Sequence, residues 1–104
     1  MSRSVVKSDS ALDDLASIWN YIAHGVPASG DPHSASRVIE ATDRTFQNLA
    51  DFPHRHQIPG RSLFRCGVEG FPQYVIIFEY DDAIVRILRV FRGDLDWERV
   101  IQDL

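Results

Sequence analysis

The sequence has little cysteine, little lysine and no long apolar run. Cys66 is the one cysteine, so no internal disulfide can form and a reducing cytoplasm is the expected compartment. No apolar stretch approaches the roughly 20 residues that a membrane helix needs. The first residues, MSRSVVKSDS, lack the apolar core of a signal peptide. These absences favour a cytoplasmic protein without a membrane segment.

Positive charge is also scarce, since the formal net charge is -4. General nucleic-acid binders usually carry a positive excess, so we expect no binding to free nucleic acid and favour a protein partner. Lys7 is the one lysine, and the remaining basic residues are arginines, which are suited to bidentate contact with carboxylate or phosphate. Acids are absent between Asp51 and Glu69, where five basic side chains gather: His54, Arg55, His56, Arg61 and Arg65.

Two helices are predicted in the first half of a single domain, residues 1–104. Apolar residues recur at helical spacing in SALDDLASIWNYIAHG, with Ser10 as the expected cap and Gly25 as the expected end. A second helix is predicted from Asp31, its cap, to about Phe52, just before Pro53. The first helix is expected to bury one stripe of side chains: Leu12, Leu15, Ala16, Trp19, Ile22 and Ala23.

The second half follows the strand period of two. RSLFRCGV predicts a strand, and QYVIIFEY with AIVRILRVF predicts a hairpin that turns at Asp81 and Asp82. Val5 and Val6 are a candidate short first strand. DWERVIQDL predicts a short C-terminal helix that packs Trp97, Ile101 and Leu104 on the body. The expected fold is therefore α+β: a two-helix antiparallel hairpin packed on a three- to four-stranded antiparallel sheet, with a short C-terminal helix.

The hairpin register follows if Tyr80 lies opposite Ala83 across the turn. The further predicted pairs are Phe78 with Val85, Ile76 with Ile87 and Tyr74 with Arg89.

Three arginines interrupt the last predicted strand, in RILRVFRGDLD. In the register above, Arg86 and Arg92 share one face of the sheet and Arg89 stands alone on the other. Glu79 lies diagonal to Arg86, so an ordinary surface ion pair, worth well under about 1 kcal/mol, accounts for Arg86. Arg89 has apolar neighbours on its own face and needs another explanation.

The order of these pieces resembles the ParE branch of the ParE/RelE superfamily of type II toxin-antitoxin toxins, also called plasmid stabilisation proteins. DLASIWNYIA and RVIEATDRTFQNLADFP are similar to that family's two helices. The second half matches through Arg65 in LFRCGVEGFPQYVIIFEY and through an ILRV strand followed by a glycine turn. In this family that turn commonly carries a histidine before the glycine and an arginine before the aspartate. Here those places hold Arg92 and Leu95.

The resemblance implies a growth-inhibiting toxin that a small ParD-like antitoxin neutralises, with DNA gyrase as the expected target. The residues expected to contact the target are Arg65, Arg89, Arg92 and Trp97. The resemblance implies no cofactor. Two alternatives stay open: a RelE-type, ribosome-dependent messenger RNA endoribonuclease, in which Arg65 would be catalytic, and a degenerate toxin that only binds its antitoxin.

The ribonuclease alternative needs a base, an acid and cations around the phosphate. Arg92 cannot be the base because arginine stays protonated. His54 and His56 suggest a metal or a proton shuttle, but two histidines without a third ligand make a poor zinc site, and a solvated loop is favoured over it. Cys66 is more readily explained as a small buried strand residue than as a nucleophile. No metal is expected.

Overall fold

The computed structural model describes residues 2–24, 32–93, 97–102 and 104. Its helices are α1 (Asp9–His24), α2 (Pro32–Asp51) and α3 (Trp97–Gln102), and its strands are β1 (Ser4–Lys7), β2 (His56–Gln57), β3 (Phe64–Val68), β4 (Phe71–Tyr80) and β5 (Ile84–Arg92). The α+β class is confirmed. No helix in the described part of the chain is long and apolar enough to cross a membrane.

The sheet has five strands in the order β1-β5-β4-β3-β2, and β1 runs parallel to β5. The prediction of three to four antiparallel strands is therefore wrong in both number and direction. Both outer strands are short, which weakens their signal in the sequence, and β1 joins β5 through residues 4–7 and 84–87. The candidate strand at Val5 and Val6 is confirmed as part of β1.

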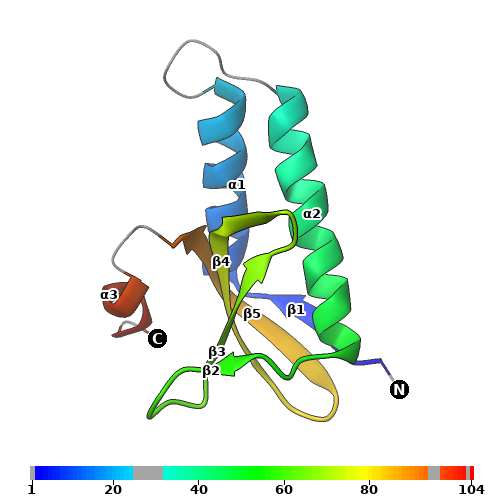
Figure 1. Ribbon diagram of the computed structural model, residues 1–104, viewed down its shortest axis with the longest axis vertical. Coiled ribbons are helices and arrows are strands. Elements are labelled where there is room, and N and C mark those ends of the chain that lie inside the picture. Colours follow the sequence, from blue (N-terminus) through cyan, green and yellow to red (C-terminus); the bar gives the residue numbers. More distant parts are fainter. Residues whose placement is uncertain (1, 25–31, 94–96, 103) are drawn as a thin grey trace.

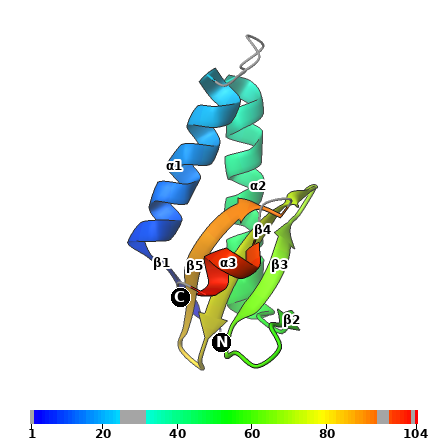
Figure 2. The same ribbon diagram turned by 90° about the vertical axis from the view of Figure 1, so that its left-hand side faces the viewer.

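The two long helices lie side by side on one face of the sheet, and α3 lies on the other (Figures 1 and 2). On the helix face the core includes Val38, Phe46 and Leu49 of α2 together with Ile76 and Phe78 of β4. A second, smaller apolar cluster lies on the opposite face and consists of Ile58, Leu63, Val75, Ile77, Phe91 and Ile101. The sheet is thus buried on both faces, which explains why β4 reads as a nearly continuous apolar run.

The cap of the first helix lies two residues earlier than predicted. Ser8, not Ser10, is the cap: the Ser8 Oγ accepts a hydrogen bond from the Ala11 amide at 3.0 Å. The same hydroxyl donates to the Leu88 carbonyl at 2.9 Å, which ties the helix start to β5. The predicted ends at Gly25 and Asp31 lie outside the described residues.

The predicted buried stripe of α1 is confirmed for Leu15, Ile22 and Ala23 but is wrong for Leu12 and Ala16. Leu12 is 50% exposed, whereas Ala11 is fully buried and Ile18 packs against the core. The helix α2 ends at Asp51, as expected from Pro53.

The β4–β5 turn lies where it was predicted. The Asp81 Oδ1 accepts hydrogen bonds from the amides of Ala83 (2.8 Å) and Ile84 (2.9 Å), and the Asp81 amide donates to the Ile84 carbonyl. These two backbone bonds to the carboxylate lower the pKa of Asp81. Residues 81–84 therefore lie between the paired residues Tyr80 and Val85, whereas pairing of Tyr80 with Ala83 would leave only residues 81 and 82 in the turn.

The predicted hairpin register is wrong by two residues near the turn. Tyr80 lies opposite Val85, and Phe78 lies opposite Ile87. A register shift between Ile77 and Phe78 then leaves one extra residue, Leu88, on β5. Arg86 lies directly opposite Glu79, and the predicted ion pair is confirmed at 3.1 Å.

The extra residue on β5 reverses which side chains face the helices. Val90 joins the helix-side core, while Phe91 joins the cluster on the other face. Beyond the bulge Arg92 lies opposite Tyr74, a helix-side residue. The prediction that Arg86 and Arg92 share a face is therefore wrong.

Candidate functional site

Two hollow surfaces contain three of the four residues predicted to bind the target. Arg89 and Arg92 line a groove beside α1, and Arg65 lines a cavity at the β2–β3 edge of the sheet. Trp97 is the first residue of α3, and its side chain lies outside the described part of the structure. The structure thus brings Arg89 and Arg92 to one groove, although the predicted register put them on opposite faces of the sheet, and it places Arg65 at a separate cavity.

The groove beside α1 is organised by a carboxylate that sequence reasoning missed. The Asp14 Oδ2 accepts a hydrogen bond from the Arg89 Nε at 2.8 Å, and its Oδ1 accepts one from the Arg89 Nη2 at 3.1 Å. The Asp14 Oδ2 also accepts from the Val90 amide at 2.9 Å. This is the bidentate geometry that makes arginine pairs strong. The side chains are only 28% and 16% exposed for Arg89 and Asp14, so solvent screens the pair weakly.

Asp14 contacts β5 just beyond the point where β1 stops pairing with that strand. The strand β1 covers β5 only as far as Ile87, and α1 follows immediately. The Val90 amide therefore donates to the side chain of α1 rather than to a strand. The signal that could have found Asp14 is Arg89 itself, since a cation within an apolar strand needs a carboxylate partner.

The groove has a volume of about 320 Å³ and a largely aromatic and aliphatic wall. Ile18 and Tyr21 of α1 and Tyr74 of β4 line it, together with residues 89–92 of β5. The Phe91 side chain itself packs in the cluster on the other face of the sheet. Tyr21 is 56% exposed, an unusual position for a large ring. Rings beside arginine are the residue types that dominate protein contacts, so this groove can bind an apolar segment that carries acids.

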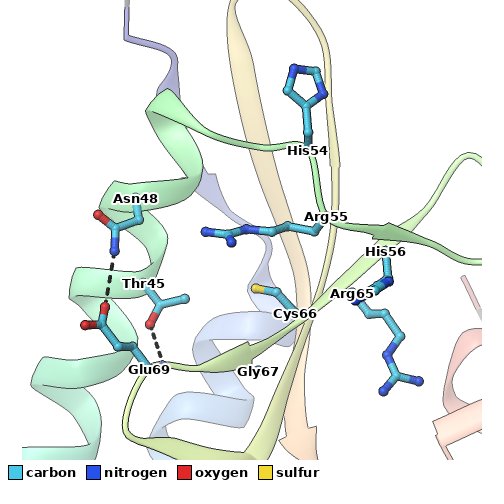
Figure 3. A pocket seen from close by; sticks show the side chains of 9 residues that line it. All are labelled: Thr45, Asn48, His54, Arg55, His56, Arg65, Cys66, Gly67 and Glu69. Atoms are coloured by element: carbon cyan, nitrogen blue, oxygen red, sulfur yellow. Dashed lines mark hydrogen bonds between the residues drawn. The ribbon is translucent and has the colours of Figure 1, made fainter.

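The cavity at the β2–β3 edge unites basic residues that the charge pattern had singled out (Figure 3). Its volume is about 750 Å³, and it is lined by Thr45, Asn48, His54, Arg55, His56, Arg65, Cys66, Gly67 and Glu69. In Figure 3 Arg55 reaches toward α2 with Cys66 beside it, whereas the Arg65 guanidinium points away. Arg61 of the same acid-free segment does not line this cavity; its guanidinium donates hydrogen bonds to the carbonyls of Ile101 and Leu104.

The histidines of this edge do not form an acid-base pair. The His54 Nδ1 is hydrogen-bonded to the Tyr80 hydroxyl at 3.0 Å, and in Figure 3 its ring points away from the cavity. His56 lies opposite Arg65 in the β2–β3 ladder. Within the described ranges, no three His, Cys, Asp or Glu side chains lie close enough together to hold a metal ion.

Cys66 is a protonated thiol at neutral pH. Burial raises the pKa of the Cys66 thiol to about 11, and the nearby Arg55 guanidinium opposes this shift only in part. The interpretation of Cys66 as a packed strand residue agrees with its contact with the helix-side core. A nucleophilic thiolate would need the opposite shift.

We expect Cys66 to react slowly with iodoacetamide. At pH 7.5 the folded chain should react roughly 100-fold more slowly than the chain in urea, because a pKa two units higher leaves that much less thiolate. The measurement is the alkylation rate followed by mass spectrometry between pH 7 and 11. A folded-state rate that levels off near pH 9, as in urea, would contradict the raised pKa.

Comparison with known proteins agrees with this fold. A family model described as the ParE toxin of the type II toxin-antitoxin system, parDE, matches residues 5–97. The chromosomal ParDE system from P. aeruginosa has a similar structure, with a TM-score of 0.70, 17% sequence identity, and coverage of 88% of this chain and 96% of that one. The RelBE2 toxin-antitoxin complex from Mycobacterium tuberculosis has a TM-score of 0.55 and 21% identity, with 88% and 99% covered.

No curated protein sequence matches the chain. At the identities of the two solved structures, the structural likeness shows the fold alone. The family match, in contrast, spans β1 to the start of α3 and includes both helices, every strand and the groove beside α1. The chain therefore belongs to the ParE toxin family of type II toxin-antitoxin systems.

Proposed function

We propose that this toxin is neutralised by a small ParD-like antitoxin and arrests growth by poisoning DNA gyrase. The observation that carries the proposal is the ParE family match over residues 5–97. The antitoxin partner is further supported by the two similar structures, whose names describe toxin-antitoxin systems. Gyrase poisoning requires no catalytic residues, only a surface that grips a protein.

The groove beside α1 is the proposed antitoxin surface. Its wall offers the exposed ring of Tyr21 and the half-buried Ile18 to apolar side chains, and Arg92 is exposed at its rim. A disordered acidic tail that folds on binding gains affinity from such a combination of rings and cations. Occupation of this groove would cover Arg92 and so block one of the residues proposed to contact the target.

The proposed target contacts are Arg65, Arg92 and Trp97. Arg89 was predicted as a fourth, but two of its guanidinium nitrogens donate to Asp14. We therefore propose that Arg89 acts by holding α1 against β5, which positions Arg92 and the groove. This role leaves Arg89 necessary for activity without requiring that it touch the target.

Ribonuclease activity receives less support from the site. In the cavity that contains Arg65, the His54 Nδ1 is bonded to the Tyr80 hydroxyl and Arg55 stays protonated, which leaves His56 and Glu69 of its lining as the candidate general bases. The net charge of -4 also disfavours docking on ribosomal RNA.

The test is a gyrase cleavage assay with purified toxin, gyrase and supercoiled plasmid. After detergent and protease treatment, we expect linear plasmid to accumulate with toxin and to disappear when antitoxin is added first. Arg92→Ala should reduce linear DNA at least about tenfold, as interface arginines commonly do. Arg37→Ala, an exposed arginine on α2, is the matched control and should leave the yield unchanged.

Other outcomes would replace the proposal. Transcript cutting that requires ribosomes, with gyrase unaffected, would assign the ribonuclease function. Growth that continues when the toxin is expressed without antitoxin would assign a protein that only binds its antitoxin.

A further inference from the structure

The cavity at the β2–β3 edge exists because β2 is short. The strand β2 pairs with β3 only through His56 with Arg65 and Gln57 with Phe64. Beyond Arg65, the outer side of β3 has no described strand beside it, and the space between this edge and α2 is the cavity. Its wall therefore combines side chains from α2, from the segment before β2 and from β3 (Figure 3).

The charges along this wall are unequal. Two arginines, Arg55 and Arg65, line it against one carboxylate, Glu69, and in Figure 3 it is the Arg55 side chain that reaches into the space. The Glu69 Oε2 already accepts a hydrogen bond from the Asn48 Nδ2 at 3.3 Å. The cavity thus has a local positive excess on a chain whose net charge is -4, and such a concave excess concentrates anions.

Arg55 differs from the arginines already described. Arg61 donates to two carbonyls, Arg86 pairs with Glu79, and Arg89 pairs with Asp14. Within the described residues, the Arg55 guanidinium has no hydrogen bond or ion pair, and it lies near the neutral thiol of Cys66. The N–H donors of its guanidinium are therefore available to an acceptor that enters the cavity.

We propose that this cavity binds a phosphate group, with Arg55 as its principal ligand and His56 as a second donor. The planar guanidinium matches two oxygens of a phosphate at once. The side-chain amide of Asn48 lies on the opposite wall, so a bound group would be held from both sides. This inference does not depend on gyrase as the target, because it rests on a different surface from the groove beside α1.

Inorganic phosphate and a backbone phosphate of a nucleic-acid strand share this chemistry. The cavity is large enough for a nucleotide, and Arg65 also lines a neighbouring hollow with His56, Gln57, Ile58 and Pro59. A strand that passes around the edge would meet Arg55 first and Arg65 next. A single phosphate would meet Arg55 alone.

The experiment is an NMR titration of the full chain with two probes, sodium phosphate and a single-stranded thymidine tetranucleotide, at matched ionic strength. We expect both probes to shift the Arg55 side-chain signal and the amides around Cys66 and Gly67. Arg55→Gln should weaken phosphate binding about tenfold or more, and Arg55→Lys should weaken it less because the charge remains. The control is Arg37→Gln, which should change affinity less than about twofold.

An Arg65 variant distinguishes a nucleic-acid strand from a single phosphate group as the ligand. If the tetranucleotide binds more tightly than phosphate and Arg65→Gln weakens only the tetranucleotide, the ligand is a nucleic-acid strand. If Arg65→Gln has no effect and the affinities are equal, the ligand is a single phosphate group. Saturation by neither probe at millimolar concentration, or equal losses for Arg55→Gln and Arg37→Gln, would overturn the proposal. Amide spectra of each variant establish that it is folded.

Discussion

Replacing Asp14 by alanine should lower the free energy of unfolding by about 2–3 kcal/mol. The change removes two charge-assisted hydrogen bonds to Arg89 and one from the Val90 amide, and bonds to charged groups contribute about 1.5–3 kcal/mol each in favourable cases. Breaking a fully buried pair costs about 3–5 kcal/mol. This pair is partly exposed, so water recovers some of the loss.

The measurement is urea denaturation, and Asp13 supplies the matched control. Asp13 is the exposed neighbour of Asp14 on the same helix, and Asp13→Ala should change stability by less than about 0.5 kcal/mol. The double variant with Arg89→Ala should cost less than the sum of the single variants by about 1–2 kcal/mol. Equal effects of the two aspartate changes would show that the ion pair contributes nothing.

This prediction also governs how toxicity data on Arg89 are read. Loss of toxicity in Arg89→Ala has two explanations, a lost target contact and a loosened α1. Asp14→Ala distinguishes the two explanations, because it loosens α1 but retains the Arg89 side chain. If Asp14→Ala keeps toxicity and Arg89→Ala loses it, Arg89 touches the target directly.

Replacing Gly93 by alanine should destabilise the fold by about 1–3 kcal/mol, the usual cost of forcing an extra methyl into a packed position. An added Cβ would lie 2.8 Å from the Val75 Cγ2. The backbone cannot move away freely, because the Gly93 amide donates to the Gln73 carbonyl at 2.7 Å. The valine side chain is also stiff, since it branches at Cβ.

The clash predicts a specific rescue. In a Val75→Ala background, Gly93→Ala should cost less than about 0.5 kcal/mol, because the opposing methyl is gone. Gly67→Ala is the control: its nearest contact would be 3.5 Å, an ordinary distance, and the change should be neutral or slightly stabilising. Urea midpoints of the unchanged protein and the four variants measure both effects. A cost for Gly93→Ala that Val75→Ala does not reduce would contradict the steric explanation.

The helices and the central hairpin were predictable because long periodic segments give strong signals. The outer strands were not, because β2 has two residues and β1 pairs with a strand from the other end of the chain. The predicted register of the β4–β5 hairpin was wrong because of two local features. The Asp81 turn uses side-chain bonds that strand patterns do not report, and the extra residue at Leu88 inverts every later side chain of β5.

The site was predictable where charge clusters along the sequence. The acid-free segment around Arg55 became one cavity, because His54 to His56 and Arg65 lie on paired strands or next to them. Asp14 could not be found in this way. Its partner Arg89 is 75 residues away, and the contact depends on the bulge that the strand period conceals.

The parallel pairing of β1 with β5 also sets the order of events during synthesis. Residues 4–7 leave the ribosome long before their partners, residues 84–87. Contacts between distant parts of a chain form late, because a long loop must first close. The groove beside α1 needs β5 for one of its walls. The groove beside α1 is therefore incomplete until β5 has been made and has paired with β1.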